Sequence, residues 1–157
     1  MVIKLDKKDV CVEYCDPFDS SFDYWMRVEH LGRYLWANDI LKNKNTKNVL
    51  DIACCNGYGT KILSEVVKKI TGIDSNKKYI KIANKKNNNS NIRYLTMNID
   101  NDEVNGKYDA IVCFETLEHV KYPDLMLQNL YNALEEDGVL LLSVPNEKYE
   151  IIENGKT

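Results

Sequence analysis

The chain has 157 residues, of which 44% are hydrophobic, and it carries a net charge of −3 with an isoelectric point of about 5.5. This length supports one hydrophobic core of ordinary size and leaves no room for a second, so we expect a single domain over 1–157. The acidic balance argues against the broad basic surface of a nucleic-acid-binding protein, and we expect no nucleic-acid partner.

No segment has the pattern of a membrane anchor or an export signal. No apolar stretch approaches the roughly 20 residues that cross a bilayer, and the N-terminus MVIKLD lacks the apolar centre of a signal peptide. The five cysteines are Cys11, Cys15, Cys54, Cys55 and Cys113. They lack paired C-x-x-C spacing, so we expect reduced thiols and no metal site. We therefore predict a cytoplasmic protein without membrane contact.

The first predicted element is a helix over 21–42, which follows an N-terminal extension over 1–20. Apolar side chains recur in it at helical spacing and predict a stripe that faces a sheet. They are Phe22, Trp25, Val28, Leu31, Leu35 and Leu41. Ser20 or Ser21 has a side chain suited to capping the start of this helix.

A predicted strand over 48–53 then runs into a glycine turn, in the sequence VLDIACCNGYGT. Gly57 and Gly59 are one residue apart, which lets the backbone approach a ligand where a helix N-terminus offers unpaired N–H groups. The dinucleotide fingerprint G-x-G-x-x-G fails, because its third glycine position is Ile62. The pattern predicts a pocket for a nucleotide-type cofactor. A lone G-x-G motif does not identify which cofactor binds there.

The second predicted strand, 70–74, ends in Asp74, seventeen residues beyond Gly57. This is close to the spacing at which a carboxylate meets ribose hydroxyls, and its two oxygens suit a cis-diol. Ser75 then starts the next predicted helix, over 76–86. The alternative role of Asp74 is to cap that helix.

Polar groups follow the next two predicted strands as well. The strand over 92–97 runs into Asn98, whose side chain could meet an adenine edge, and the connection over 100–107 is too short for a crossover helix. The strand over 108–114 is followed by Glu118 and His119. His119 suits proton transfer, with Glu118 setting its tautomer. The alternative is a histidine bonded to backbone at a helix start.

The last predicted helix begins at Pro123 and ends at Asp137-Gly138, before a strand over 139–144 that is covered on both sides. Its inward-facing side chains are Leu127, Leu130, Ala133 and Leu134. The alternation predicts the α/β class, as a Rossmann-like three-layer αβα sandwich whose mainly parallel sheet has about five strands. The cofactor-binding core spans 48–146 and a tail spans 147–157.

Five segments, taken together in their order along the chain, resemble the class I S-adenosylmethionine-dependent methyltransferases. Within this class, the resemblance is to the group that acts on small molecules or glycans. The segments are 29–34, the glycine motif, Asp74, the run FETLEHV over 114–120 and the run LSVPN over 142–146. The resemblance implies S-adenosylmethionine as cofactor and S-adenosylhomocysteine as product. It also implies a seven-stranded sheet, of which this chain lacks about two strands. An exposed fifth strand would pair with a second copy, be covered by the tail residues 149–152, or reflect a chain cut short.

The resemblance also assigns roles to individual residues. The cofactor-binding set is Arg33, Asp51, Ala53, Cys54, Gly57, Asp74, Ser75, Asn98, Ile99, Phe114 and Glu115, and the catalytic set is His119 and Glu118. Asp51 would orient the glycine turn or meet the methionine amino group, and Arg33 would pair with the methionine carboxylate. Asn98 stands where family members usually carry an aspartate for the adenine amino group. In some related quinone O-methyltransferases a segment like 115–119 is implicated in binding a divalent metal. Metal binding by this segment is therefore the alternative to our expectation of no metal site.

Cys55 departs from the family pattern D-x-A-C-G-x-G, because it stands at the position of the first glycine. A side chain at positive φ costs about 1–2 kcal/mol there. The sequence therefore predicts a methyltransferase that acts on an oxygen or nitrogen of a small molecule or sugar. One alternative is a catalytically impaired or partner-dependent S-adenosylmethionine-binding module. A nicotinamide-dependent oxidoreductase ranks last among the alternatives, because the third glycine of the dinucleotide fingerprint is missing.

Overall fold

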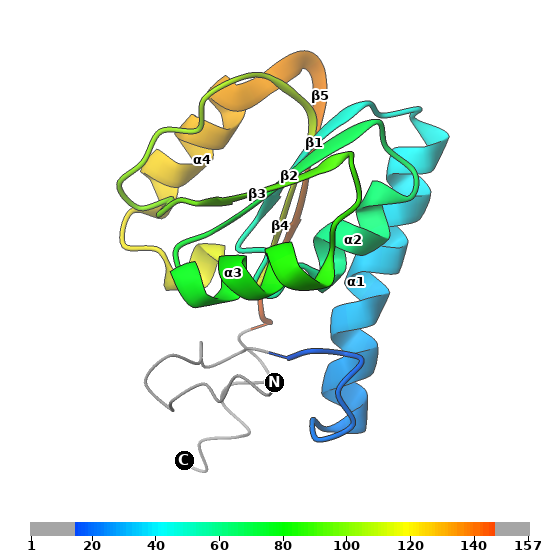
Figure 1. Cartoon of the computed structure of the whole chain (residues 1–157). Helices are drawn as coiled ribbons and strands as arrows, with labels where there is room; N and C mark the ends of the chain where they lie inside the picture. The colour runs from blue at the N-terminus through cyan, green and yellow to red at the C-terminus, as the bar shows by residue number, and fades with distance from the viewer. Residues whose placement is uncertain (1–14, 147–157) are drawn as a thin grey trace.

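The computed structural model describes residues 15–146, in which helices and strands alternate (Figure 1). The helices are α1 (Tyr24–Asn43), α2 (Tyr58–Ser64), α3 (Lys77–Lys86) and α4 (Pro123–Ala133). The strands are β1 (Asn48–Ile52), β2 (Lys69–Asp74), β3 (Ile92–Thr96), β4 (Tyr108–Phe114) and β5 (Leu134–Ser143). A short 3-10 turn, η2 (Leu117–His119), follows β4. Expectations for Cys11 and for the tail lie outside the described residues.

The five strands form one sheet in the order β3-β2-β1-β4-β5, and every pairing is parallel. The predicted α/β class and strand number are confirmed. Since β1 lies between β2 and β4, the chain reverses its direction of travel across the sheet at this point. Ligands of such sheets bind outside the carboxyl ends of the strands at this switch point.

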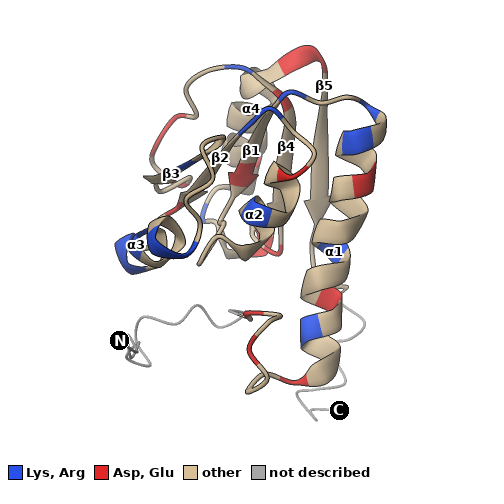
Figure 2. Ribbon diagram, turned by 45° about the vertical axis from the view of Figure 1, so that its right-hand side comes forward, with Lys and Arg blue, Asp and Glu red and all other residues tan. Residues whose placement is uncertain are grey.

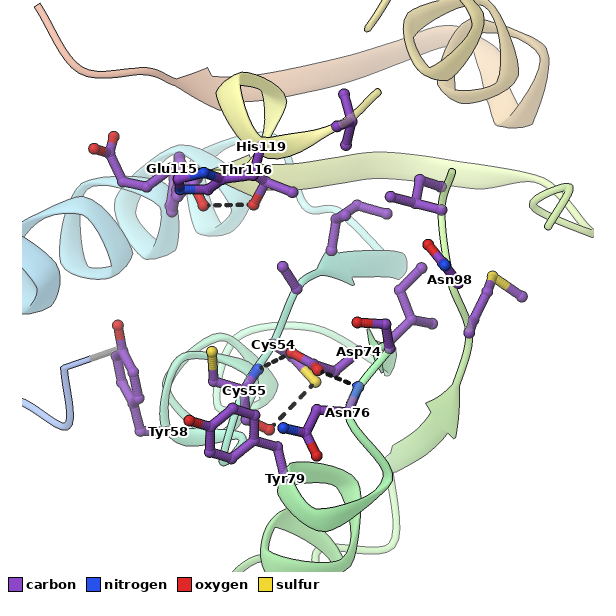
Figure 3. Close-up of a pocket in the computed structure, with 18 of the residues that line it drawn as sticks. Cys54, Cys55, Tyr58, Asp74, Asn76, Tyr79, Asn98, Glu115, Thr116 and His119 are labelled. Atoms are coloured by element: carbon purple, nitrogen blue, oxygen red, sulfur yellow. Dashed lines mark hydrogen bonds between the residues drawn. The ribbon is translucent and has the colours of Figure 1, made fainter. Parts of the chain in front are cut away.

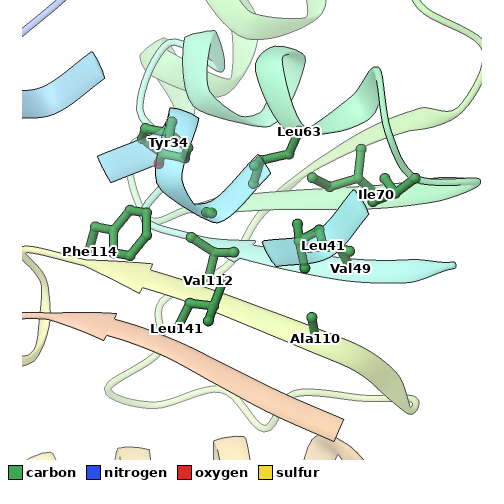
Figure 4. Packing of buried hydrophobic residues seen from close by; sticks show 11 residues of the cluster. Tyr34, Leu41, Val49, Leu63, Ile70, Ala110, Val112, Phe114 and Leu141 are labelled. Carbon is green, nitrogen blue, oxygen red and sulfur yellow. The ribbon is translucent and has the colours of Figure 1, made fainter. Parts of the chain in front are cut away.

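Side chains from both faces of the sheet are buried under helices. On one face α1 and α2 cover a cluster that includes Leu41, Val49 and Leu63 (Figure 4). On the other face α4 covers a cluster that includes Leu50 and Met126. Because successive β1 residues point to opposite faces, Val49 and Leu50 enter different clusters. The result is the predicted three-layer sandwich.

The connection from β3 to β4 contains no helix, as predicted. Met97, Ile99 and Val104 of this connection pack against the α4-side cluster. Apolar side chains of the loop therefore cover part of the sheet face that a crossover helix would otherwise cover. The start of this loop also forms part of the site described below.

Helix α1 corrects two sequence expectations. It begins at Tyr24, and Asp23 caps it in place of Ser20 or Ser21, since Asp23 Oδ1 accepts from the Trp25 and Met26 amides at 2.9 and 3.2 Å. The predicted apolar stripe is wrong for most of its members, as Trp25 is 69% exposed and Leu35 51% exposed. The buried side chains of α1 are Tyr34, Ala37 and Leu41. The first half of α1 extends past the end of the sheet, so its apolar side chains do not face the sheet there (Figure 1).

The end of the described chain also differs from the expectation. Helix α4 stops at Ala133, and Asp137 and Gly138 lie inside β5, which has a register irregularity opposite Tyr108 and Ala110. The expected burial on both sides is wrong at the strand end, where Leu142 is 37% exposed. Within residues 15–146, β5 pairs with β4 alone.

Charged side chains of both signs lie along α1, whereas α3 carries lysines near both of its ends (Figure 2). Helix α3 begins as predicted, but its cap is Asn76, whose Oδ1 accepts from the Lys78 amide at 2.9 Å. Within the described part of the chain, no helix combines the length and the apolar character needed to cross a bilayer.

Candidate functional site

A cavity of about 570 Å³ lies at the carboxyl ends of the strands (Figure 3). This volume is in the range of sites that enclose a small ligand. The predicted residues that line it are Arg33, Ala53, Cys54, Asp74, Ser75, Asn98, Ile99, Phe114, Glu115 and His119. Three predicted residues, Asp51, Gly57 and Glu118, lie outside this lining. The topology therefore gathers most of the predicted site in one place.

The turn between β1 and α2 has an unusual backbone. Ala53, Cys55 and Gly57 have φ of 54°, 48° and 80°, so left-handed residues recur at every second position. The positive φ expected at Cys55 is confirmed. Gly57 has no substitute here, because a Cβ atom would lie 2.5 Å from the Tyr94 hydroxyl. The Cys54 amide donates to the Ile73 carbonyl at 2.9 Å, which ties the turn to β2.

Asp51 lies in β1 directly before this turn, where it joins the start of α2 to α1. It is fully buried, and its two carboxylate oxygens accept from the Tyr34 hydroxyl at 3.2 Å and from the Thr60 hydroxyl at 2.6 Å. Burial raises the pKa of Asp51 to about 7, because a charged carboxylate is costly without solvent. Of its two expected roles, this position favours orienting the glycine turn.

Asp74 joins the turn to the start of α3. Its Oδ2 accepts from the Cys55 amide at 2.9 Å, and its Oδ1 accepts from the Asn76 amide at 2.8 Å. Burial raises the pKa of this carboxyl. A carboxylate has about four acceptor positions and these two amides use two of them, so Asp74 retains capacity to accept further hydrogen bonds. Asp74 can therefore brace the protein and still accept from a diol.

Arg33 and Glu115 form an ion pair on the far side of the cavity from Asp74, where Figure 3 shows Glu115. Arg33 Nη2 lies 3.3 Å from Glu115 Oε2, and the Ser143 hydroxyl donates to Glu115 Oε1 at 2.6 Å. Glu115 itself has a φ of 46° and donates its amide to the Ser143 carbonyl at 3.0 Å. Arg33 Nη1 is buried and has no hydrogen-bond partner among residues 15–146.

Asn98 lies beyond the end of β3 and lines the cavity with Ile99. Its Oδ1 accepts from the Asp100 amide at 3.1 Å, and its own amide donates to Asp102 Oδ2 at 2.8 Å. The side chain is thereby oriented by its own loop. The bond to Asp102 uses the backbone N–H of Asn98, so the side-chain Nδ2 and the remaining acceptor position of Oδ1 stay available to a ligand.

Glu118 and His119, after β4, are both exposed, and of the two only His119 lines the cavity. The tautomer-setting role of Glu118 stays a prediction. Thr116, which the sequence did not single out, lines the cavity, and its hydroxyl donates to the Phe114 carbonyl at 2.8 Å. Among the described residues, no three His, Cys, Asp or Glu side chains gather in a way that could hold a metal ion.

Sequence reasoning also missed three residues of the opposite wall. Cys15, His30 and Tyr58 line the cavity, and His30 Nδ1 lies 3.2 Å from the Tyr58 hydroxyl oxygen. These residues lie on three separate segments and carry no common motif. The packing of α1 beside α2 brings His30 and Tyr58 together, and the segment before α1 adds Cys15.

A parallel sheet in this order, with a left-handed turn after β1 and an acid at the end of β2, defines a Rossmann-like domain that holds a nucleotide-type ligand. A family model described as "Methyltransferase domain" matches residues 24–156. The chain belongs to this methyltransferase family, and the family predicted from the residue pattern is confirmed.

Similar proteins agree with this membership. The ubiquinone biosynthesis O-methyltransferase of Glaesserella parasuis is 31% identical over 122 residues, which are 73% of this chain and 52% of that protein. The malonyl-[acyl-carrier protein] O-methyltransferase of Acetivibrio thermocellus is 31% identical over 105 residues, 66% of this chain and 37% of that protein. The chain thus spans about half the length, or less, of these curated relatives.

Solved structures confirm the fold. Magnesium protoporphyrin IX methyltransferase (ChlM) from Synechocystis, solved with bound S-adenosylhomocysteine, has a TM-score of 0.71 at 18% identity over 87% of this chain and 67% of that chain. The N-methyltransferase NodS from Bradyrhizobium japonicum, in complex with S-adenosylhomocysteine, has a TM-score of 0.66 at 23% identity over 74% and 60% of the two chains.

Proposed function

We propose that this chain binds S-adenosylmethionine in the cavity and transfers its methyl group to an oxygen or nitrogen of a small-molecule or sugar acceptor. The observation that carries the proposal is the placement of two polar groups on opposite sides of one cavity. Asp74 offers acceptor oxygens on one side, and Arg33 offers a buried, unpartnered N–H group on the other. The family membership supports the same cofactor.

The residues present fit the parts of this cofactor. The carboxylate of Asp74 would accept from the two ribose hydroxyls, and the guanidinium of Arg33 would donate to the methionine carboxylate. Asn98 and Ile99 would meet the adenine, one through its amide and the other through apolar contact. The left-handed turn at Ala53 and Cys55 would bring the backbone close to the methionine part.

When bound, the cofactor supplies a methyl group already activated by its sulfonium. Transfer breaks the carbon–sulfur bond, forms a carbon–oxygen or carbon–nitrogen bond and leaves S-adenosylhomocysteine. The protein therefore has to align the acceptor and exclude water more than to activate the methyl group. The imidazole of His119 would take the acceptor's proton, since it lies on the cavity wall beyond Phe114 and Glu115. An oxygen acceptor is favoured because the two curated relatives are both O-methyltransferases.

The proposal is tested by incubating the chain with methyl-labelled S-adenosylmethionine and a panel of phenols, carboxylic acids, sugars and amines. We expect label transfer to one class of acceptor. His119→Asn should abolish transfer while leaving the Kd for S-adenosylhomocysteine unchanged. Transfer by His119→Asn at the wild-type rate would contradict the role of this residue.

A second candidate is a cofactor-binding module without turnover of its own, or one that needs a partner. Cys55 motivates it, because its side chain occupies a strained position next to Asp74, the carboxylate proposed to bind the ribose. This reading expects binding of S-adenosylhomocysteine but no label transfer to any acceptor class. Addition of a partner that restores transfer would identify the partner-dependent form.

We also propose that β5 pairs with a second copy of the chain. Within the described residues it contacts one neighbouring strand, and unpaired edges are ready templates for strand addition. Leu142 and Val144 at the end of this edge are 37% and 49% exposed. Sedimentation should give a dimer, and a monomer at high concentration would contradict this proposal.

A further inference from the structure

Asp16, outside every predicted part of the site, is buried against the left-handed turn. It is 7% exposed, and its Oδ2 accepts from Asn56 Nδ2 at 2.7 Å. Lys86, at the end of α3, places Nζ 3.1 Å from the same oxygen. Oδ1 accepts from the Phe18 amide at 3.0 Å. A buried carboxylate needs such partners, and Asp16 has three of them from three segments of the chain.

The amide that Asp16 holds belongs to the turn itself. Asn56 is 1% exposed, and it lies between Cys55 and Gly57, both at positive φ. Asn56 Oδ1 accepts from the Tyr58 amide at 3.3 Å, at the first residue of α2. Both ends of the Asn56 side chain are therefore occupied, so its orientation is fixed by Asp16 on one side and by the start of α2 on the other.

This bond matters because non-glycine residues rarely adopt a left-handed backbone without support from their surroundings. The turn receives support from Asp74, which accepts from the Cys55 amide. Asp16 adds a second brace, from the N-terminal side. Its neighbour Cys15 lines the cavity, so this brace also places residues 15–18 against the cavity beside the turn.

We propose that Asp16 is a positioning residue that holds the turn over 53–57 in the shape that receives the cofactor. It acts through Asn56 and does not itself line the cavity. The inference rests on the proposed function for its effect on binding, but its effect on the turn can be measured without any ligand.

The matched variants are Asp16→Asn and Asp19→Asn, because Asp19 is a nearby acid whose carboxylate accepts from the Ser21 amide within its own loop. In the ligand-free chain we expect amide hydrogen exchange at Cys55 and Gly57 to be about tenfold faster in Asp16→Asn and unchanged in Asp19→Asn. Unchanged exchange in Asp16→Asn would overturn the proposal, whether or not the chain binds S-adenosylhomocysteine.

Binding then separates positioning from a general structural role. We expect Asp16→Asn to raise the Kd for S-adenosylhomocysteine about tenfold. Asn56→Asp should raise it by a similar factor, because it places two carboxylates against each other. The double variant Asp16→Asn with Asn56→Asp restores a hydrogen bond of reversed direction and should recover most of the affinity. If Asp16→Asn does not fold, the comparison of Asn56→Asp with the double variant decides. A double variant as weak as Asn56→Asp would overturn the proposal. Failure of the wild type to bind would contradict the proposed function alone.

Discussion

Arg33 and Glu115 lie 82 positions apart in the sequence, yet their side chains form an ion pair at 3.3 Å on the cavity wall. The pair joins α1 to the end of β4, and Ser143 ties it to β5. One guanidinium nitrogen remains buried and unpartnered among the described residues, and we propose that it donates to the methionine carboxylate.

The first prediction concerns this anion-binding role. Arg33→Ala should raise the Kd for S-adenosylhomocysteine by about ten- to a hundredfold, because a hydrogen bond between charged groups contributes about 1.5–3 kcal/mol. Lys42→Ala, which removes a positive charge from the exposed end of the same helix, is the control. Equal affinities of the two variants, measured by calorimetry, would contradict the assignment.

A second prediction concerns the strained cysteine. Cys55→Gly should raise the melting temperature by about 2 °C, because relief of the left-handed Cβ exceeds the entropy that glycine loses on folding. The neighbouring Cys54→Gly is a control of opposite sign, because Cys54 is buried and is not among the residues at positive φ. Thermal unfolding checks both variants. A lower melting temperature for Cys55→Gly would mean that the thiol stabilises the turn.

A third prediction follows from the buried carboxyl of Asp51. Its pKa is raised from 3.8 to about 7 in the folded chain, so the folded state binds this proton more tightly than the unfolded state. The stability that results is complete below about pH 4 and is lost as pH rises through about 7. Asp51→Asn, a neutral isostere, should therefore flatten the fall in stability between pH 5 and 8.

Urea unfolding at pH 5.5 and pH 8 measures this effect. The control is Asp39→Asn, on the exposed side of α1, which should keep the wild-type dependence on pH. Parallel pH profiles for wild type and Asp51→Asn would show that this carboxyl is already charged in the folded state.

Local sequence pattern was sufficient for β1 to β4 and for much of the site, whereas β5 begins earlier than predicted. An apolar strand that ends in an acid predicts a buried strand whose acid lies at its carboxyl end. Asp74 accordingly lines the cavity, as predicted. Periodicity failed at Trp25 and Leu35, because a helical stripe does not reveal how far the helix overhangs the sheet. The side-chain pairing of Glu115 with Arg33, and of Asp16 with Asn56, joins distant segments and leaves no local signal.

The most direct test of the account is a calorimetric titration of the chain with S-adenosylhomocysteine, with Asp74→Ala as the variant and Asp39→Ala as the control. Asp74 accepts from backbone amides and faces the cavity, whereas Asp39 is exposed on α1. The account predicts saturable binding at one site by the wild type and the control, and binding weakened by about a hundredfold or more in Asp74→Ala. Absence of binding by the well-folded wild type, or equal binding by Asp74→Ala, would contradict it.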